Sequence, residues 1–142
     1  MGVLMRIEMK LALSLLLAMS LNSYASDLII VANTEQADIT LNKRQVRDIF
    51  MGDNSQFLLK PIAMAPRSKS RYTFNTRVVG LTESRIQSYW AQMRFSGRKK
   101  APREFDSLES LLVHLQNNKE TVAYLPSDTK LPDGLIIVYE MN

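Results

Sequence analysis

The alternation of apolar and polar residues divides the chain into short strands and amphipathic helices. Apolar, β-branched runs at 27–32, 121–125 and 135–139 predict buried strands. A fourth apolar run, at 57–65, predicts another strand, although Pro61 places its early part at a sheet edge or outside the hydrogen-bonded ladder. Strands that alternate with helices along a chain predict a layered α/β domain.

Four helices are predicted from apolar faces and capping residues. The first begins after Asn42, where Gln45 completes a capping box, and it ends at Gly52. The second follows the turn at 67–70 and is closed by Gly80, while Thr82 and Asp106 open the third and fourth. The expected core residues of these three helices are Phe74 and Val78, then Ile86, Tyr89, Trp90 and Met93, then Leu108, Leu111, Leu112 and Leu115.

The first residues have the pattern of a cleavable secretory signal. Arg6 and Lys10 precede an eleven-residue apolar run, and a polar stretch ending in Ser23-Tyr24-Ala25 follows. A helix that crosses a bilayer needs about 18–20 apolar residues. The shorter run therefore predicts a signal peptide over 1–25. We expect a periplasmic protein that does not span the membrane after signal removal, with one domain over 26–142.

Charge is distributed unevenly along the chain. From Lys60 to Arg103 there are eleven Lys or Arg residues and one carboxylate, Glu83, whereas the rest of the expected mature chain has five basic and twelve acidic residues. This asymmetry predicts either one positively charged face that attracts anions or an ordinary surface on which opposite charges meet in three dimensions. The chain contains no cysteine, so it cannot be a lipoprotein and cannot use disulfides.

The turn Arg67-Ser68-Lys69-Ser70-Arg71 joins a predicted strand to a predicted helix. At such a junction the helix N-terminus presents unpaired N–H groups and the positive end of its dipole to an anion. Ser70, as the N-cap, would bond the helix's own N–H groups or offer its hydroxyl to a bound oxyanion. Arg67 and Arg71 would supply forked, charge-assisted donors. The alternative interpretation is that Ser70 only caps the helix and the cations are solvated.

A second basic segment, the loop at 95–103, contains four cations and a glycine. It could form a second wall of an anion site, or it could bind acidic lipid headgroups or the carboxylates of a partner. Together with the nearby aromatic residues Tyr89 and Trp90, these cations resemble a nucleic-acid-binding surface. The helical spacing of the two aromatic residues is better explained by packing, and export separates the chain from nucleic acid, so no nucleic-acid partner is predicted.

Catalytic chemistry finds little support in the sequence. His114 is the only histidine, lies within a leucine-rich helix, and is expected to be a helix-face residue rather than a base. Without cysteine, and with one carboxylate in the basic stretch, no nucleophile–base pair and no metal site can be assembled. Ser–Lys chemistry using Ser68 or Ser70 with Lys69 has only adjacency in its favour. We expect a protein that is not an enzyme and uses no metal or cofactor.

Four short segments, spread along the chain, carry a resemblance to a known family that extends over roughly Leu28 to Tyr139. They are Val46–Gly52, which contains an IF-x-G ending; Pro61–Arg67 followed by Ser70 and Phe74; Tyr89–Arg98; and Thr121–Pro126. In this order they resemble the phosphate ABC transporter substrate-binding proteins, the PstS-like family, and in particular its short, stand-alone members.

The resemblance implies a periplasmic-binding-protein-like fold of type II, present here as a single lobe with a small mixed sheet flanked by helices. Full-length members of this family clamp phosphate between two lobes. By position, Arg67 matches the phosphate-contacting arginine and Ser70 the serine of the family's Ser-Gly-Thr turn. Arg71 and Tyr72 stand where Gly and Thr are expected. A large side chain hinders the close backbone approach that glycine allows, which predicts weak anion binding.

Together these features predict an exported, substrate-binding-like protein that binds phosphate or a similar oxyanion on Arg67, Ser68, Ser70 and Arg71. The resemblance implies an association with phosphate ABC transport and with an ABC permease or another envelope protein. The alternative is a non-catalytic interaction module that docks its basic face on an acidic envelope partner or surface.

Overall fold

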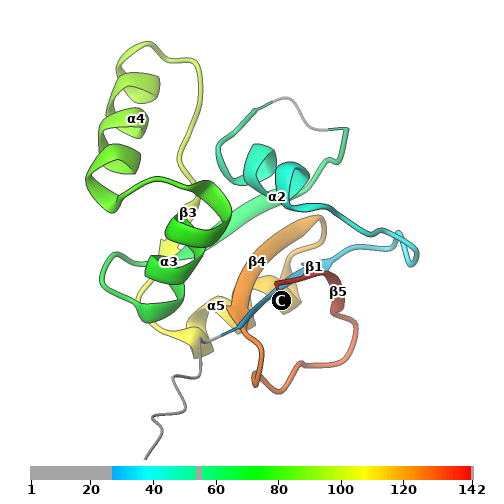
Figure 1. The fold of residues 1–142 in the computed structure, drawn as a ribbon. Coiled ribbons are helices and arrows are strands. Elements are labelled where there is room, and N and C mark those ends of the chain that lie inside the picture. Colours follow the sequence, from blue (N-terminus) through cyan, green and yellow to red (C-terminus); the bar gives the residue numbers. More distant parts are fainter. Residues whose placement is uncertain (1–26, 54–55, 142) are drawn as a thin grey trace, which may run out of the picture.

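A computed structural model describes residues 27–53 and 56–141 (Figure 1). The signal peptide predicted over 1–25 lies outside the described residues. The described chain forms one five-stranded sheet in the order β3-β2-β4-β1-β5. The strands are β1 (Leu28–Asn33), β2 (Lys60–Met64), β3 (Arg103–Phe105), β4 (Thr121–Pro126) and β5 (Ile136–Glu140).

The sheet is mixed. β2 runs parallel to both of its neighbours, β3 and β4, whereas β1 runs antiparallel to β4 and β5. The helical elements are α2 (Lys43–Phe50), α3 (Lys69–Phe74), the π-helical turn η1 (Asn75–Val79), α4 (Glu83–Phe95) and α5 (Leu108–Asn117). The predicted α/β class, a small mixed sheet flanked by helices, is confirmed.

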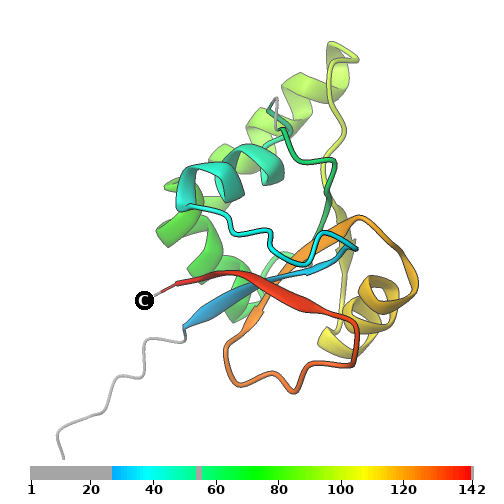
Figure 2. The ribbon, with the colours of Figure 1, turned by 90° about the vertical axis from the view of Figure 1, so that its right-hand side faces the viewer.

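Helices cover both faces of the sheet (Figures 1 and 2). α5 packs on one face, and α2, α3 and η1 pack on the other, with α4 beyond them. β1 is buried throughout because its alternate side chains enter two separate cores: Ile30 lies under α2 and α3, and Val31 lies under α5. None of the described helices combines the length and apolar character needed to span a membrane.

The capping signals at α2 are confirmed in detail. The Asn42 side chain accepts a hydrogen bond from the Gln45 backbone N–H (2.9 Å), and the Gln45 side chain accepts one from the Asn42 N–H (2.8 Å). Gly52, just beyond the helix, has φ 70°, which is the left-handed conformation expected of a helix-ending glycine. Gly80 closes the α3–η1 helix in the same way, with φ 75°.

Two predicted caps were wrong. Ser68, rather than Ser70, is the N-cap of α3, and Ser107, rather than Asp106, is the N-cap of α5. In both places a competent capping residue lies within two positions of the true cap, so residue preference alone does not fix where the helix begins.

The strand β3 was not predicted: Arg103 was assigned to the basic loop, and Glu104 and Phe105 lie between that loop and the predicted helix start at Asp106. It is only three residues long and largely polar, and it forms because Ala63 and its neighbours in β2 provide a parallel partner. The pairing of β2 with β3 begins at Ile62, so β3 does not pair with β2 at Pro61. At Pro61, β2 is paired only with β4. Lys60, the preceding residue, donates its N–H toward the β4 side, to Glu120 O at 2.8 Å. Pro61 is therefore tolerated within an internal strand.

The core beneath α5 provides a test of the packing. Leu111 is fully buried there, whereas Val113, on the same helix, is 55% exposed. Leu111→Ala is expected to lower the free energy of unfolding by about 2–5 kcal/mol, because it removes apolar contacts and leaves a cavity. Val113→Ala should change it by less than about 0.5 kcal/mol. Urea denaturation of residues 26–142 measures both; equal effects would contradict this assignment of the core.

Candidate functional site

The turn after β2 has an unusual backbone conformation. Ala65 donates its N–H to Phe105 O (2.9 Å) and so ties the start of the turn to the end of β3. Ser68 donates its N–H back to Ala65 O (3.3 Å). Between them, Arg67 has φ 79°, a left-handed conformation that glycine adopts freely and other residues rarely adopt. A charged side chain is thus held at a position where glycine would fit the backbone better.

Ser68 and the first turn of α3 provide hydrogen-bond donors at this point. The Ser68 hydroxyl oxygen accepts from the Arg71 backbone N–H (3.0 Å), which leaves its own O–H free to donate. Within the described part of the chain, no group accepts from the backbone N–H of Lys69 or Ser70. These N–H groups are the unpaired donors of a helix N-terminus, and they can donate hydrogen bonds to an oxyanion.

A surface hollow of about 790 Å³ adjoins the turn. Three of the four predicted site residues, Arg67, Ser68 and Arg71, line this hollow. Ser70 is not among the lining residues, and neither is any residue of the basic loop 95–103, so the structure does not make that loop a second wall of this site. The remaining lining residues are Pro66, Lys69, Tyr72, Asn75, Thr76, Leu81, Thr82 and Glu83.

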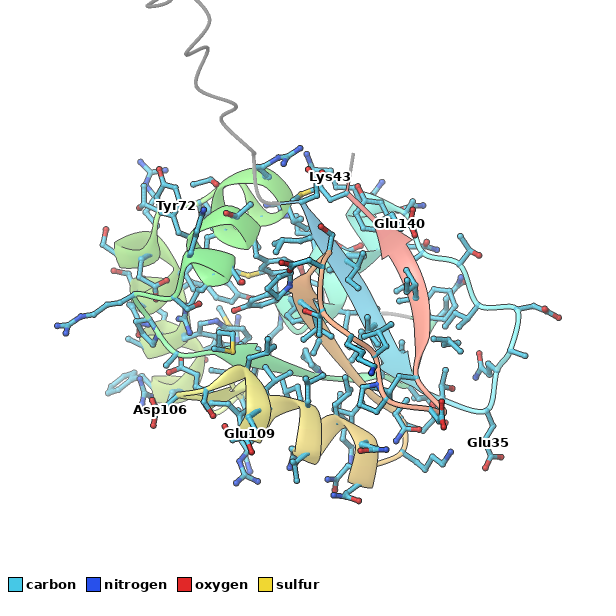
Figure 3. The ribbon with its side chains drawn as sticks, turned by 90° about the horizontal axis from the view of Figure 1, so that it is seen from below. Glu35, Lys43, Tyr72, Asp106, Glu109 and Glu140 are labelled. Atoms are coloured by element: carbon cyan, nitrogen blue, oxygen red, sulfur yellow. The ribbon has the colours of Figure 1, made fainter. Side chains whose placement is uncertain are left out.

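The hollow is open at the side of the molecule. Tyr72, one of its lining residues, is 72% exposed and lies at the outer edge of the helices (Figure 3). Arg67 and Lys69 are also exposed, and neither makes an ion pair with any described residue. The two unpaired cations at the turn are therefore free to meet an anion from solution.

Arg71 is in a different situation, because its side chain is buried and already bound. Its Nε and one terminal nitrogen donate to both carboxylate oxygens of Glu83 (2.8 and 2.6 Å). Its other terminal nitrogen donates to Glu104 (2.7 Å) and to Met64 O (2.9 Å). The guanidinium group thus retains at most one N–H for an external anion, out of five.

The ion pairs of Arg71 shift the pKa values of the groups involved. Burial alone would lower the pKa of Arg71, but the hydrogen bonds and charges of Glu83 and Glu104 outweigh it and raise that pKa. For Glu83, partial burial would raise the pKa, yet hydrogen bonds from Arg71, Gln87 and Asn75 together with the Arg71 charge lower it. Arg71 and Glu83 are therefore ionised at neutral pH, and the guanidinium group faces two carboxyl groups, those of Glu83 and Glu104.

Other members of the basic middle segment also meet opposite charges. Lys99 Nζ lies 2.6 Å from Asp53 Oδ1, and an Arg77 nitrogen lies 3.8 Å from Asp27. The Lys99 pKa is raised mainly by its hydrogen bonds to Asp53 and Tyr89. Both interpretations of the uneven charge thus apply in part: some cations are paired in three dimensions, and others are exposed.

The surroundings of His114 are those of a helix-face residue. His114, in α5, packs against the Phe105 ring with centroids 5.0 Å apart. Its pKa is lowered by burial and then by the charge of Arg103. Among residues 27–53 and 56–141, no group of three or more His, Cys, Asp or Glu side chains is placed to hold a metal ion.

Comparison with known proteins identifies the class of fold. No protein-family model matches the chain, and no curated protein matches its sequence. Among solved structures, the chain is similar to an ABC-type phosphate transport receptor from Vibrio cholerae, with a TM-score of 0.56 and 17% identity. The similarity covers 79% of this chain and 45% of the receptor, so the chain spans less than half of that protein.

This similarity shows a partial periplasmic-binding-protein-like fold and confirms the predicted architecture. At 17% identity the similarity supports only a shared fold. Membership of the PstS-like family stays a prediction.

The buried guanidinium allows a test of what Arg71 does. Arg71→Met keeps most of its volume but leaves Glu83 and Glu104 without their partner. We expect a cost of about 2 kcal/mol at pH 7, at the low side for a buried pair because both carboxylates are partly exposed. Arg85→Met, which removes an exposed cation that makes no ion pair with any described residue, should cost less than about 0.5 kcal/mol.

The cost of Arg71→Met should also depend on pH. Because the pKa of Glu83 is lowered in the fold, its ionised form stabilises the fold above the ordinary value of 4.5. That contribution is lost as the pH falls through the lowered pKa. The difference in unfolding free energy between wild type and Arg71→Met should therefore narrow below pH 4.5. Urea titrations between pH 3 and pH 7 measure it, and a constant difference would show that packing, not charge, carries the effect.

Proposed function

We propose that the protein is an exported binding protein that holds phosphate, or a similar oxyanion, at the turn after β2. Arg67 supplies the forked charge, and the Ser68 hydroxyl and the Ser70 backbone N–H supply neutral donors. Arg71 takes part mainly through its backbone N–H, which fixes the Ser68 oxygen. The observation that carries the proposal is the exposed, unpaired Arg67 in a left-handed conformation beside free N–H donors and an open hollow.

The same geometry predicts weak, rapidly reversible binding. The contacts lie open to water, where charge-assisted interactions are worth much less than in an enclosed site. Glu83 and Glu104 also pair with Arg71, so the Arg71 charge adds little to the attraction of an anion in the hollow. A second surface that closed over the hollow would strengthen every one of these contacts.

The proposed biological setting is the periplasm, in association with phosphate ABC transport. Two observations support it: the signal-peptide pattern at 1–25, and a fold shared with part of a phosphate transport receptor. In this setting the chain is a binding protein rather than an enzyme, and its macromolecular partner is a permease or another envelope protein.

The second candidate function is docking of the basic surface on an acidic partner. It is favoured by exposed cations such as Arg85, Arg94 and Arg98, which make no ion pair with any described residue. Under this alternative no small oxyanion is required.

Arg67→Gly tests the oxyanion site without the usual risk of unfolding. Glycine adopts a φ of 79° without strain. The free energy of unfolding of the variant should therefore equal that of wild type or exceed it by up to about 1 kcal/mol. For a dissociation constant of about 1 mM, 10 mM phosphate should stabilise wild type by about 1.4 kcal/mol and raise the melting temperature by several degrees. The variant should lose this shift.

The control for that titration is Arg85→Gln, which removes one exposed cation from α4 and should retain the full phosphate response. Sodium chloride at matched ionic strength separates specific binding from screening. Absence of any shift in wild type at 10 mM phosphate and sulfate would refute the oxyanion site and favour docking on an acidic partner.

A further inference from the structure

The end of α4 and the connection to β3 project from the body of the protein. We call residues 94–100 the α4 tip. Figures 1 and 2, at right angles to each other, both place this segment at an extremity of the described chain, away from the sheet. Gly97, with φ 67°, forms the turn at its apex, where the space that a side chain would enter is open.

An aromatic side chain lies on this projection without any packing partner. Phe95 is 97% exposed, the largest exposed fraction among the large hydrophobic residues of the described chain. The neighbouring aromatic residues of α4 behave differently: Trp90 is buried, and Tyr89 donates its hydroxyl to Met51 O at 2.9 Å. Among the large hydrophobic residues of α4, Phe95 is therefore the only exposed one.

Cations surround Phe95, and the tip contains no carboxylate. Arg94, Arg98 and Lys100 are exposed and make no ion pair with any residue in 27–53 or 56–141. The fourth cation, Lys99, instead ties the base of the tip to the turn after α2 and to α4: its Nζ donates to Asp53 Oδ1 (2.6 Å) and to the Tyr89 hydroxyl (3.1 Å). The tip is therefore fixed at its base and cationic at its end.

We propose that the α4 tip binds the surface of an anionic lipid bilayer. Phe95 enters the boundary between headgroups and acyl chains, where aromatic rings are favoured, and the three cations contact lipid phosphates. This surface is separate from the hollow beside Arg67, since no residue of the tip lines that hollow. The inference goes beyond the proposed oxyanion site and does not depend on it.

The shape of the tip favours a lipid surface over a protein partner. A stable protein interface buries about 800 Å² on each side, with 20–30 residues and a pocket for its aromatic anchors. The tip is a convex segment of seven residues, 94–100. A bilayer accepts a protruding aromatic ring without a matching pocket, and its phosphates provide the complementary charge.

Vesicle binding tests the proposal directly. The experiment uses residues 26–142, whose described part contains the whole sheet and both cores, so that the apolar run at 11–21 cannot itself insert into lipid. Sedimentation with vesicles of phosphatidylcholine containing about one-third phosphatidylglycerol should recover the protein at low salt; pure phosphatidylcholine should not. Arg98→Gln with Lys100→Gln should weaken partitioning about thirtyfold, and Phe95→Ala about tenfold.

The matched control is Lys43→Gln with Lys130→Gln, which removes the same charge from α2 and from the β4–β5 connection. It should retain most of the binding; loss equal to that of the tip variant would mean that net charge alone attracts the protein and would overturn the proposal. So would an unchanged affinity in Phe95→Ala.

A fluorescence readout distinguishes lipid from other anions. In Phe95→Trp the introduced indole starts exposed, whereas Trp90 is buried and provides a constant background. Its emission should shift to the blue with anionic vesicles and stay unchanged with 10 mM phosphate at constant ionic strength. A shift with an acidic polypeptide such as polyglutamate, but none with vesicles, would overturn the lipid assignment in favour of a protein partner. The phosphate titration of the Arg67 site contains no lipid. The oxyanion site and the lipid-binding tip are therefore tested independently, and one can be refuted without the other.

Discussion

The contacts of one buried guanidinium group link four parts of this structure. Arg71, on α3, binds Glu83 at the start of α4, Glu104 in β3 and the carbonyl oxygen that ends β2. Arg71 is only 6% exposed, and a buried cation is stable only when carboxylates neutralise its charge and acceptors bind its N–H groups. Burial of Arg71 therefore requires all of these elements to be in position. These contacts hold β3, already paired with β2, and the start of α4 beside α3, and Asn75 in η1 adds a further hydrogen bond to Glu83 (2.7 Å).

The same network limits how the protein can recognise an anion. The family resemblance expects glycine and threonine where Arg71 and Tyr72 stand, and the structure shows that Arg71 serves an internal ion cluster. In the proposed oxyanion site, the contacts to the anion therefore come from Arg67, Ser68 and the free N–H groups of the turn. The protein's own carboxylates occupy the deeper guanidinium, and only the outer one faces solution.

Local signals in the sequence were sufficient for most elements, because apolar periodicity and capping chemistry act over a few residues. The capping box at Asn42, the helix closed by Gly80 and the buried strand β1 could all be predicted in this way. The strand β3 and the partners of Arg71 could not, because both depend on residues distant in the sequence. The exchange of Ser70 for Ser68 as cap has the same origin: the hydrogen bond from Ala65 to Phe105 sets where the turn begins.

The pairing of β1 determines when the protein can fold. Its neighbours in the sheet are β4 and β5, so that Asn33 pairs with Thr121 and Ile30 with Tyr139. Such distant contacts form slowly, and here they cannot form until nearly the whole chain has left the ribosome. During synthesis the earliest strand remains without a partner on either side. The sheet is therefore completed only after β5, its last strand, has been synthesised.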